Sequence, residues 1–268
     1  MAYLFGFLGT GNMGGALARA ACKTLPVSQG VLSNRTAEKA KALAAELGCD
    51  WAENKTVAQE AKYLFLGVKP QMMEQLLAEI GPVLAARKDR FILVTMAAGL
   101  TMERIAAMAG GDYPVIRIMP NTPVDVGEGV IFYTVNGLVK PGELAEFVEG
   151  MAAGGLLDPL EERLLDAGSA VAGCGPAFCD LFLEALADGG VACGLPRDKA
   201  LRYAAQMVLG SATLMLETGK HPGALKDAVC SPGGSTIQGV RALEKGGFRS
   251  AVLEAVIAAY EKSIDLGK

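Results

Sequence analysis

Two hydrophobic patterns divide this chain into two parts. From Tyr3 to about Pro159, short β-branched and aromatic runs alternate with longer segments of helical period. This alternation is typical of parallel strands joined by helical crossovers. The predicted strands are Tyr3 to Leu8, Gly30 to Ser33, Tyr63 to Val68, Phe91 to Thr95, Val115 to Met119 and Gly129 to Thr134; the predicted helices include Ala16 to Lys23, Ala37 to Leu47 and Met72 to Ala86.

After Gly155 the strand signals nearly vanish and helical spacing takes over. Apolar residues recur at helical intervals around Phe178 to Leu186 and again from Val252 to Tyr260. Gly194-Leu195-Pro196 and His221-Pro222-Gly223 mark breaks between helices. We therefore predict an α/β N-terminal domain with a mostly parallel sheet, residues 1–160, and an all-α C-terminal domain, residues 161–268.

Composition narrows the class of protein. Apolar residues make up 51% of the chain and the net charge is −4, so no basic field attracts nucleic acid. The apolar N-terminus lacks a preceding basic region and reads as a strand rather than a signal peptide. Because charged residues recur throughout, we expect no stretch of ~20 apolar residues that would cross a membrane. The six cysteines lack C-x-x-C spacing and His221 is the only histidine, which predicts no metal site and reduced thiols in a cytoplasm.

A glycine-rich loop follows the first predicted strand. Its residues are Gly9, Thr10, Gly11, Asn12, Met13 and Gly14, and they lead into a predicted helix. In this context Gly9 permits a tight turn, Gly11 lets the backbone approach a pyrophosphate, and Gly14 lets helix and strand pack closely. We predict a Rossmann-type domain in which this loop binds a dinucleotide. The alternative is an ordinary glycine turn.

The end of the second predicted strand bears on which dinucleotide binds. NAD sites usually carry Asp or Glu there, ~20 residues after the glycine loop, to bind the ribose hydroxyls. Here Ser33 is followed by Asn34, Arg35 and Thr36, and the planar guanidinium of Arg35 suits a phosphate. The sequence therefore favours NADP, with NADPH preferred and NADH possible. The alternative is that Arg35 sits on a solvated helix start.

A second loop of small residues lies near the C-terminus. Ser231, Pro232, Gly233, Gly234, Ser235 and Thr236 lead directly into a predicted helix. Glycines let a ligand approach the backbone, and the amides and dipole of a helix start favour a negative group. A plain helix N-cap with a proline turn is the alternative. Two such loops predict two ligands brought together, a dinucleotide and a small acid.

Several of these segments together resemble the pyrroline-5-carboxylate reductase family. The resemblance runs along almost the whole chain and is most specific in the block from Asp227 to Ile237. Cys174 and Phe178 stand where the family more often has Ser and Tyr. The other matching segments are Gly9 to Gly14, Ser33 to Thr36, Val68 to Gln71, Ala97 to Gly99, Arg117 to Pro123 and Gly173 to Phe178.

The resemblance implies an activity and roles for particular residues. The activity is hydride transfer from a nicotinamide to a cyclic imine bearing a carboxylate, which yields proline. Ser231, Gly233, Gly234, Ser235 and Thr236 would hold the substrate, and the Thr236 hydroxyl would orient the ring nitrogen. Further cofactor contacts are expected at Asn54, Val68, Lys69, Pro70, Ala97, Ala98, Met119, Pro120 and Asn121. Each of these could instead be simple strand-end turn chemistry.

The helical half carries a large apolar load, including Leu181, Leu209 and Leu216. One small bundle would not bury it, and the resemblance implies a C-terminal dimerisation domain, with dimers sometimes assembled into larger rings.

Other activities remain as alternatives. A reductase of a related cyclic imine fits the same residues. A β-hydroxyacid dehydrogenase would need a Lys soon after Gly175, where none occurs, and a dinucleotide sensor would not need the second loop. His221 is given no role, and the stripe Asp180, Glu184 and Asp188 reads as solvated or subunit-facing.

Overall fold

A computed structural model describes residues 2–266 of the chain. The chain divides into two compact units, the first comprising Met1–Gly173 and Tyr260–Lys268 and the second Cys174–Ala259. Within this division residues 161–173 group with the N-terminal part of the chain. The domain boundary between residues 160 and 161 stays a prediction.

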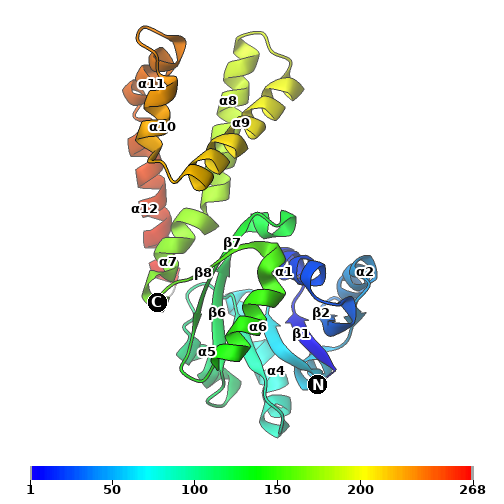
Figure 1. Cartoon of the computed structure of the whole chain (residues 1–268). Helices are drawn as coiled ribbons and strands as arrows, with labels where there is room; N and C mark the ends of the chain where they lie inside the picture. The colour runs from blue at the N-terminus through cyan, green and yellow to red at the C-terminus, as the bar shows by residue number, and fades with distance from the viewer. Residues whose placement is uncertain (1, 267–268) are drawn as a thin grey trace. The chain divides into compact units, whose positions relative to one another are not determined.

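The first unit contains an eight-stranded, mostly parallel sheet within the described residues (Figure 1). The strand order is β3-β2-β1-β4-β5-β6-β7-β8, and only the β6–β7 pair is antiparallel in this sheet. This confirms the predicted fold class. The strands are β1 (Tyr3–Leu8), β2 (Gly30–Ser33), β3 (Asp50–Trp51), β4 (Ala61–Leu66), β5 (Ile92–Thr95), β6 (Val115–Pro120), β7 (Gly129–Val135) and β8 (Gly155–Pro159).

Two of these strands were not predicted. Strand β3 is only two residues long and both are exposed, and β8 is mostly exposed at the opposite edge. The expectation that strand signals end at about Gly155 was therefore wrong for β8. Edge strands such as these are defined by backbone pairing rather than by a buried apolar run, so the hydrophobic pattern carries little trace of them.

Helices cover both faces of the sheet. On one face α1 (Asn12–Thr24), α2 (Ala37–Leu47) and α6 (Pro141–Met151) pack with Phe5 and Phe65 in one core cluster. On the other, α3 (Asn54–Glu60), α4 (Met73–Ala86) and α5 (Met102–Ala109) pack with Leu64 and Leu66 in a second. Adjacent β4 residues thus point to opposite faces, as the period of a strand requires. The stacked rings of Phe7 and Phe65, 4.4 Å between centroids, anchor the first cluster.

Short helical turns complete the first unit. The 3₁₀ turns are Val27–Gln29, Pro70–Met72, Thr122–Val126, Ala152–Gly154 and Glu162–Leu164, followed by α7 (Leu165–Gly168) and a π turn at Ser169–Gly173.

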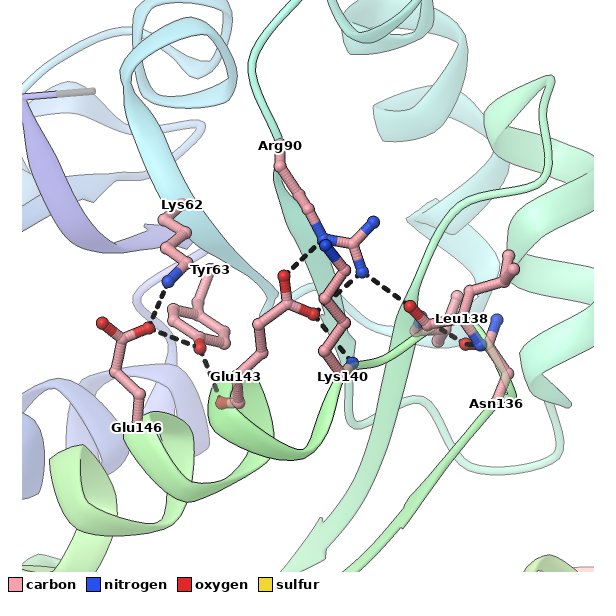
Figure 2. Close-up of polar contacts among 9 residues, drawn as sticks. Lys62, Tyr63, Arg90, Asn136, Leu138, Lys140, Glu143 and Glu146 are labelled. Carbon is pink, nitrogen blue, oxygen red and sulfur yellow. Dashed lines mark hydrogen bonds and ion pairs between the residues drawn. The ribbon is translucent and has the colours of Figure 1, made fainter.

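A polar network ties α6 to the amino ends of β4 and β5 (Figure 2). Arg90 pairs with the Glu143 carboxylate through Nε and through Nη2, the latter at 2.9 Å, and the Lys140 amide donates to Glu143 at 2.9 Å. The Tyr63 hydroxyl lies 2.6 Å from the Glu143 carbonyl and 2.7 Å from Glu146 Oε2, and Lys62 pairs with the same carboxylate. Burial and the Glu146 carboxylate raise the pKa of Tyr63, so its hydroxyl stays a donor.

The second unit is helical, as predicted. Its helices are α8 (Gly175–Ala192), α9 (Arg197–Thr218), α10 (Pro222–Val229), α11 (Ser235–Lys245) and α12 (Phe248–Leu266), the last of which continues into the first unit. Helices α8 and α9 form a hairpin, and Phe182 contacts Phe248 at 5.7 Å between ring centroids. Large apolar side chains nevertheless stay exposed, among them Leu181 at 68% and Leu216 at 75%. Exposure on this scale marks an interaction surface.

The expectation that no segment could cross a membrane needs correction. Within residues 2–266, the helical run Glu162–Ala192 is long and apolar enough by length and composition, since an 18-residue window of it has a mean hydropathy of 1.4. The expectation relied on recurring charges, but none occurs between Asp166 and Asp180. Length and composition alone are weak evidence for a span, since helices of non-membrane proteins meet the same criterion.

Candidate active site

A groove of ≈ 740 Å³ opens at the carboxyl edge of the sheet. Its walls are the segments that follow three neighbouring strands: Gly9 to Asn12 after β1, Asn34 to Thr36 after β2, and Gly67 to Lys69 after β4. Strand order reverses between β1 and β4, and ligands of open α/β sheets bind at such a switch point. Gly9 to Asn12 of the first motif and Asn34 to Thr36 of the second therefore line one groove, whereas Met13 and Gly14 do not.

Glycines make the close packing of the first loop possible. Gly9 has φ 107°, a conformation that residues with a side chain rarely adopt. A Cβ on Gly14 would lie 2.1 Å from the Gly9 carbonyl oxygen, and one on Gly67 would lie 2.2 Å from it. By contrast, a Cβ on Gly11 would have no neighbour within 4 Å, because it would project into the groove. Gly14 thus serves packing and Gly11 leaves room for a ligand, as the motif predicts.

The start of α1 is suited to a pyrophosphate. The helix begins at Asn12, earlier than the predicted Ala16. Its N-cap residue is Gly11, which has no side chain to cap the first amides. The first amides of α1 are therefore left without a side-chain cap at the positive end of the helix dipole. The hydroxyl of Thr10 is buried without a hydrogen-bond partner among the described residues. A polar ligand in the groove would satisfy it.

Cations surround the groove. Arg35, Lys39 and Lys69 all line it, and no side-chain hydrogen bond or ion pair of theirs is found within residues 2–266. The acidic residue of the lining, Glu46, forms an ion pair with Arg19, with 2.9 Å between Arg19 Nε and Glu46 Oε1. The unpaired charge of the lining is thus positive, which fits an anionic ligand such as a phosphorylated dinucleotide.

Sequence reasoning missed Arg19, Lys39 and Gly67 in this lining. Lys39 lies in the first turn of α2, a helix that was predicted correctly, but Arg35 precedes this helix, so helical spacing does not place the two side chains together. Gly67 falls inside the predicted strand Tyr63 to Val68, whereas β4 ends at Leu66. A glycine near the end of that run is the signal that could have placed it beside the first glycine loop.

Asn54 lies outside the main groove. It borders a second cavity of ≈ 310 Å³ that it shares with Asn34 and Arg35. Its side chain accepts a hydrogen bond from Ser33 Oγ at 2.7 Å and donates to Glu79 at 3.0 Å. These bonds tie the start of α3 to the end of β2 and to α4, and a cofactor contact through Asn54 remains a prediction.

The predicted cofactor residues Ala97, Met119, Pro120 and Asn121 lie at the carboxyl ends of β5 and β6, at the same edge of the sheet, but do not line the groove. Ala97, Met119 and Pro120 are buried, and Asn121 uses its amide to accept from the Val130 amide at 2.9 Å and to donate to the Ala172 carbonyl at 3.0 Å. The Asn121 side chain thus supports the surrounding backbone. Roles for these residues, and for Met13, Pro70 and Ala98, stay predictions.

The second small-residue loop belongs to the second unit. Gly234 donates its amide to the Ser231 carbonyl at 3.0 Å, and Gly233 has φ 71°. Proline then glycine at the two central positions is the signature of a type II turn. The turn leads into α11, whose N-cap Gly234 makes no side-chain capping bond. The loop therefore presents uncapped amides beside the exposed Thr236, an arrangement that can bind a carboxylate.

Two residues that were given no catalytic role from the sequence form structural contacts within the second unit. His221 Nδ1 accepts from the Gly223 amide at 3.0 Å and so caps α10. Asp188 of the carboxylate stripe pairs with Arg197. Within residues 2–266 no cluster of His, Cys, Asp and Glu could hold a metal ion.

Fold and groove together define a class: an NADP-dependent oxidoreductase with a Rossmann domain and a helical domain for self-association. A domain described as NADP oxidoreductase, coenzyme F420-dependent, matches residues 4–99, and the pyrroline-5-carboxylate reductase dimerisation domain matches residues 162–266. The Escherichia coli (strain K12) pyrroline-5-carboxylate reductase is 42% identical over 98% of both chains, and the Glycine max enzyme is 38% identical over 98% of this chain and 96% of its own. The chain belongs to the pyrroline-5-carboxylate reductase family.

Solved structures agree with this assignment. A pyrroline carboxylate reductase from Plasmodium falciparum with NADP bound superposes with a TM-score of 0.86 at 29% identity, covering 99% of this chain and 98% of the other. The Coxiella burnetii enzyme gives a TM-score of 0.89 at 28% identity and covers 100% of both chains.

Proposed function

We propose that this chain reduces 1-pyrroline-5-carboxylate to L-proline with NADPH, the last step of proline biosynthesis. The observation that carries the proposal is near-full-length identity to named pyrroline-5-carboxylate reductases, at 42% for the Escherichia coli enzyme. Both the groove at the sheet edge and the loop from Ser231 to Thr236 fit the two ligands that this reaction needs.

The cofactor is held by the first unit. The amides at the start of α1 and the open face of Gly11 receive the pyrophosphate, and Thr10 donates to it or to a neighbouring oxygen. Arg35 and Lys39 bind the 2′-phosphate, which distinguishes NADPH from NADH. Once bound, NADPH supplies the hydride that is added to the carbon of the C=N bond.

The substrate is held by the loop before α11. The amides of Gly233, Ser235 and Thr236, together with the dipole of α11, bind the carboxylate, whereas the Gly234 amide closes the turn onto Ser231. The Thr236 hydroxyl accepts from an iminium N–H or donates to the amine nitrogen of the product. An imine is basic enough to be partly protonated in water, so positioning and one modest hydrogen bond replace a strong general acid.

The chain acts as a homodimer that forms through the helices of the second unit. Such dimers could assemble further into larger rings. The exposed apolar residues on these helices and the match to a dimerisation domain support this proposal. We further propose a cytoplasmic location, with no nucleic acid, membrane or metal partner. Sedimentation at low micromolar concentration tests the assembly, and a stable, active monomer would refute it.

A single assay tests the activity. Loss of NADPH absorbance is followed after adding 1-pyrroline-5-carboxylate, and proline is identified as the product. A β-hydroxyacid dehydrogenase would instead turn over a hydroxyacid with NADP, and a dinucleotide sensor would bind NADPH without consuming it. Comparing pyrroline-5-carboxylate with a six-membered cyclic imine acid separates the leading proposal from a reductase of a related imine.

A further inference from the structure

Two cysteines of the first unit meet over the start of β2, one helical turn beyond Arg19, which lines the cofactor groove. Cys22 lies near the end of α1, and Cys49 follows the glycine that ends α2. A Cβ placed on buried Gly30 would lie 3.7 Å from Cys22 Sγ and 3.7 Å from Cys49 Cβ. The two side chains therefore converge over the backbone of Gly30, where the missing side chain leaves them room.

The two thiols interact directly and can be reached from solvent. A hydrogen bond from the Cys49 thiol lowers the pKa of Cys22, and the same interaction raises the pKa of Cys49. Both residues are half-buried rather than enclosed. Cys22 is accordingly the better nucleophile of the pair, with a second thiol positioned to resolve any adduct that it forms.

We propose that Cys22 and Cys49 form a reversible disulfide, a modification site that couples the thiol redox state to cofactor binding. The oxidant is a low-molecular-weight disulfide of the glutathione class. The Cys22 thiolate attacks one of its sulfurs, forming a mixed disulfide and releasing one thiolate. The Cys49 thiolate then attacks Cys22 Sγ and releases the second. The protein loses two electrons and two protons, and one small disulfide becomes two thiols.

The position of this bond links it to the groove. Arg19 precedes Cys22 by three residues on α1, and Glu46 precedes Cys49 by three; the two form an ion pair and both line the groove. A disulfide would therefore join the same two elements that this ion pair joins. Because an S–S bond of ~2.05 Å is shorter than any non-bonded contact of two sulfurs, oxidation draws the end of α2 toward α1.

The expected consequence is weaker cofactor binding. Narrowing the groove at Arg19 and Glu46 should raise the Kd for NADPH by roughly 3- to 10-fold, the factor that loss of one hydrogen bond produces. The inference rests on the proposed cofactor groove but not on the identity of the substrate.

The test measures the bond and the binding separately. The full-length protein is equilibrated with oxidised glutathione, digested without reduction, and searched by mass spectrometry for a peptide pair joined through Cys22 and Cys49. NADPH binding is titrated by fluorescence before oxidation, after it, and after dithiothreitol. Cys22→Ser and Cys49→Ser should lose both the bond and the response, whereas Cys193→Ser, which removes an exposed thiol in the second unit, should keep both.

Two results would overturn the proposal: no joined peptide in the wild type, or a joined peptide with an unchanged Kd. Alanine variants replace the serine variants if the latter melt at a lower temperature. These measurements contain no imine, so their result would be the same if the protein did not reduce the imine. Failure of the reduced protein to bind NADPH would instead refute the cofactor assignment.

Discussion

Replacing Glu143 with Gln should destabilise the protein by about 2 kcal/mol at neutral pH. The Glu143 side chain is 10% exposed and accepts from both the Arg90 guanidinium and the Lys140 amide (Figure 2). Breaking a fully buried pair costs about 3–5 kcal/mol, and an exposed pair contributes about 1 kcal/mol or less. Because Arg90 is 38% exposed, solvent screens the pair and the expected cost falls between these limits.

The same substitution should change how stability depends on pH. The Arg90 guanidinium, opposed by burial and helped by the Lys140 amide, holds the pKa of Glu143 below its ordinary value. A carboxyl group whose pKa is lower in the folded state than in the unfolded state stabilises the fold. This stabilisation is complete above the unfolded-state pKa of Glu, about 4.3, and it is lost as the pH falls through the folded-state pKa. The difference between wild type and Glu143→Gln should therefore be constant from neutral pH down to about 5 and shrink in more acidic solution.

Urea unfolding at fixed protein concentration measures this difference. Concentration must be held constant because self-association adds to apparent stability. Glu149→Gln is the matched control, because Glu149 lies exposed on the same helix and its substitution removes the same charge. The reasoning fails if Glu143→Gln unfolds at the same urea concentration as Glu149→Gln, or if its deficit persists undiminished at the lowest pH at which the wild type folds.

Three further predictions concern the cofactor groove and the loop before α11. Arg35→Ala should weaken NADPH binding by roughly 10-fold or more, through loss of bonds to a charged phosphate, and leave NADH binding unchanged in fluorescence titrations; an unchanged preference would exclude Arg35 from phosphate recognition. Thr236→Ala should lower kcat by roughly 10- to 100-fold in steady-state assays, whereas unchanged kinetics would remove Thr236 from the mechanism. Gly14→Ala should lower the melting temperature because its Cβ would lie 2.1 Å from a carbonyl oxygen, whereas Gly11→Ala should melt like wild type yet bind NADPH poorly; equal melting of the two would contradict this division.

Much of the fold could be predicted because burial determines it. The central strands β1, β4 and β5 are buried between two layers of helices, and their apolar runs identify them. The direction of β7 could not be predicted, since a hydrophobic run looks the same in a parallel and an antiparallel pairing. Strand β8 was not predicted because its side chains are mostly exposed and its position depends on hydrogen bonds to β7.

The candidate site was predictable where the chain follows a local rule. The glycine loop and Arg35 each sit directly after a strand, so the sequence places them at one edge of the sheet. Lys39 and Arg19 come from the sides of helices, and only the packing of α1 and α2 brings them to the groove. Asn121 illustrates the opposite limit: it follows a strand as required, but its amide is engaged by backbone groups that no local pattern reveals.

The two loops differ in what holds them in place, and this separates binding from turnover. Contacts among Gly9, Gly14 and Gly67 shape the first glycine loop within one compact unit, and the groove that this loop borders is lined by residues of that unit. The loop before α11 belongs to a unit whose helices leave residues such as Leu216 exposed, and these must be covered for the unit to persist in water. We therefore expect NADPH recognition to be a property of the folded chain, and reduction of the imine to depend on the assembly that buries those helices.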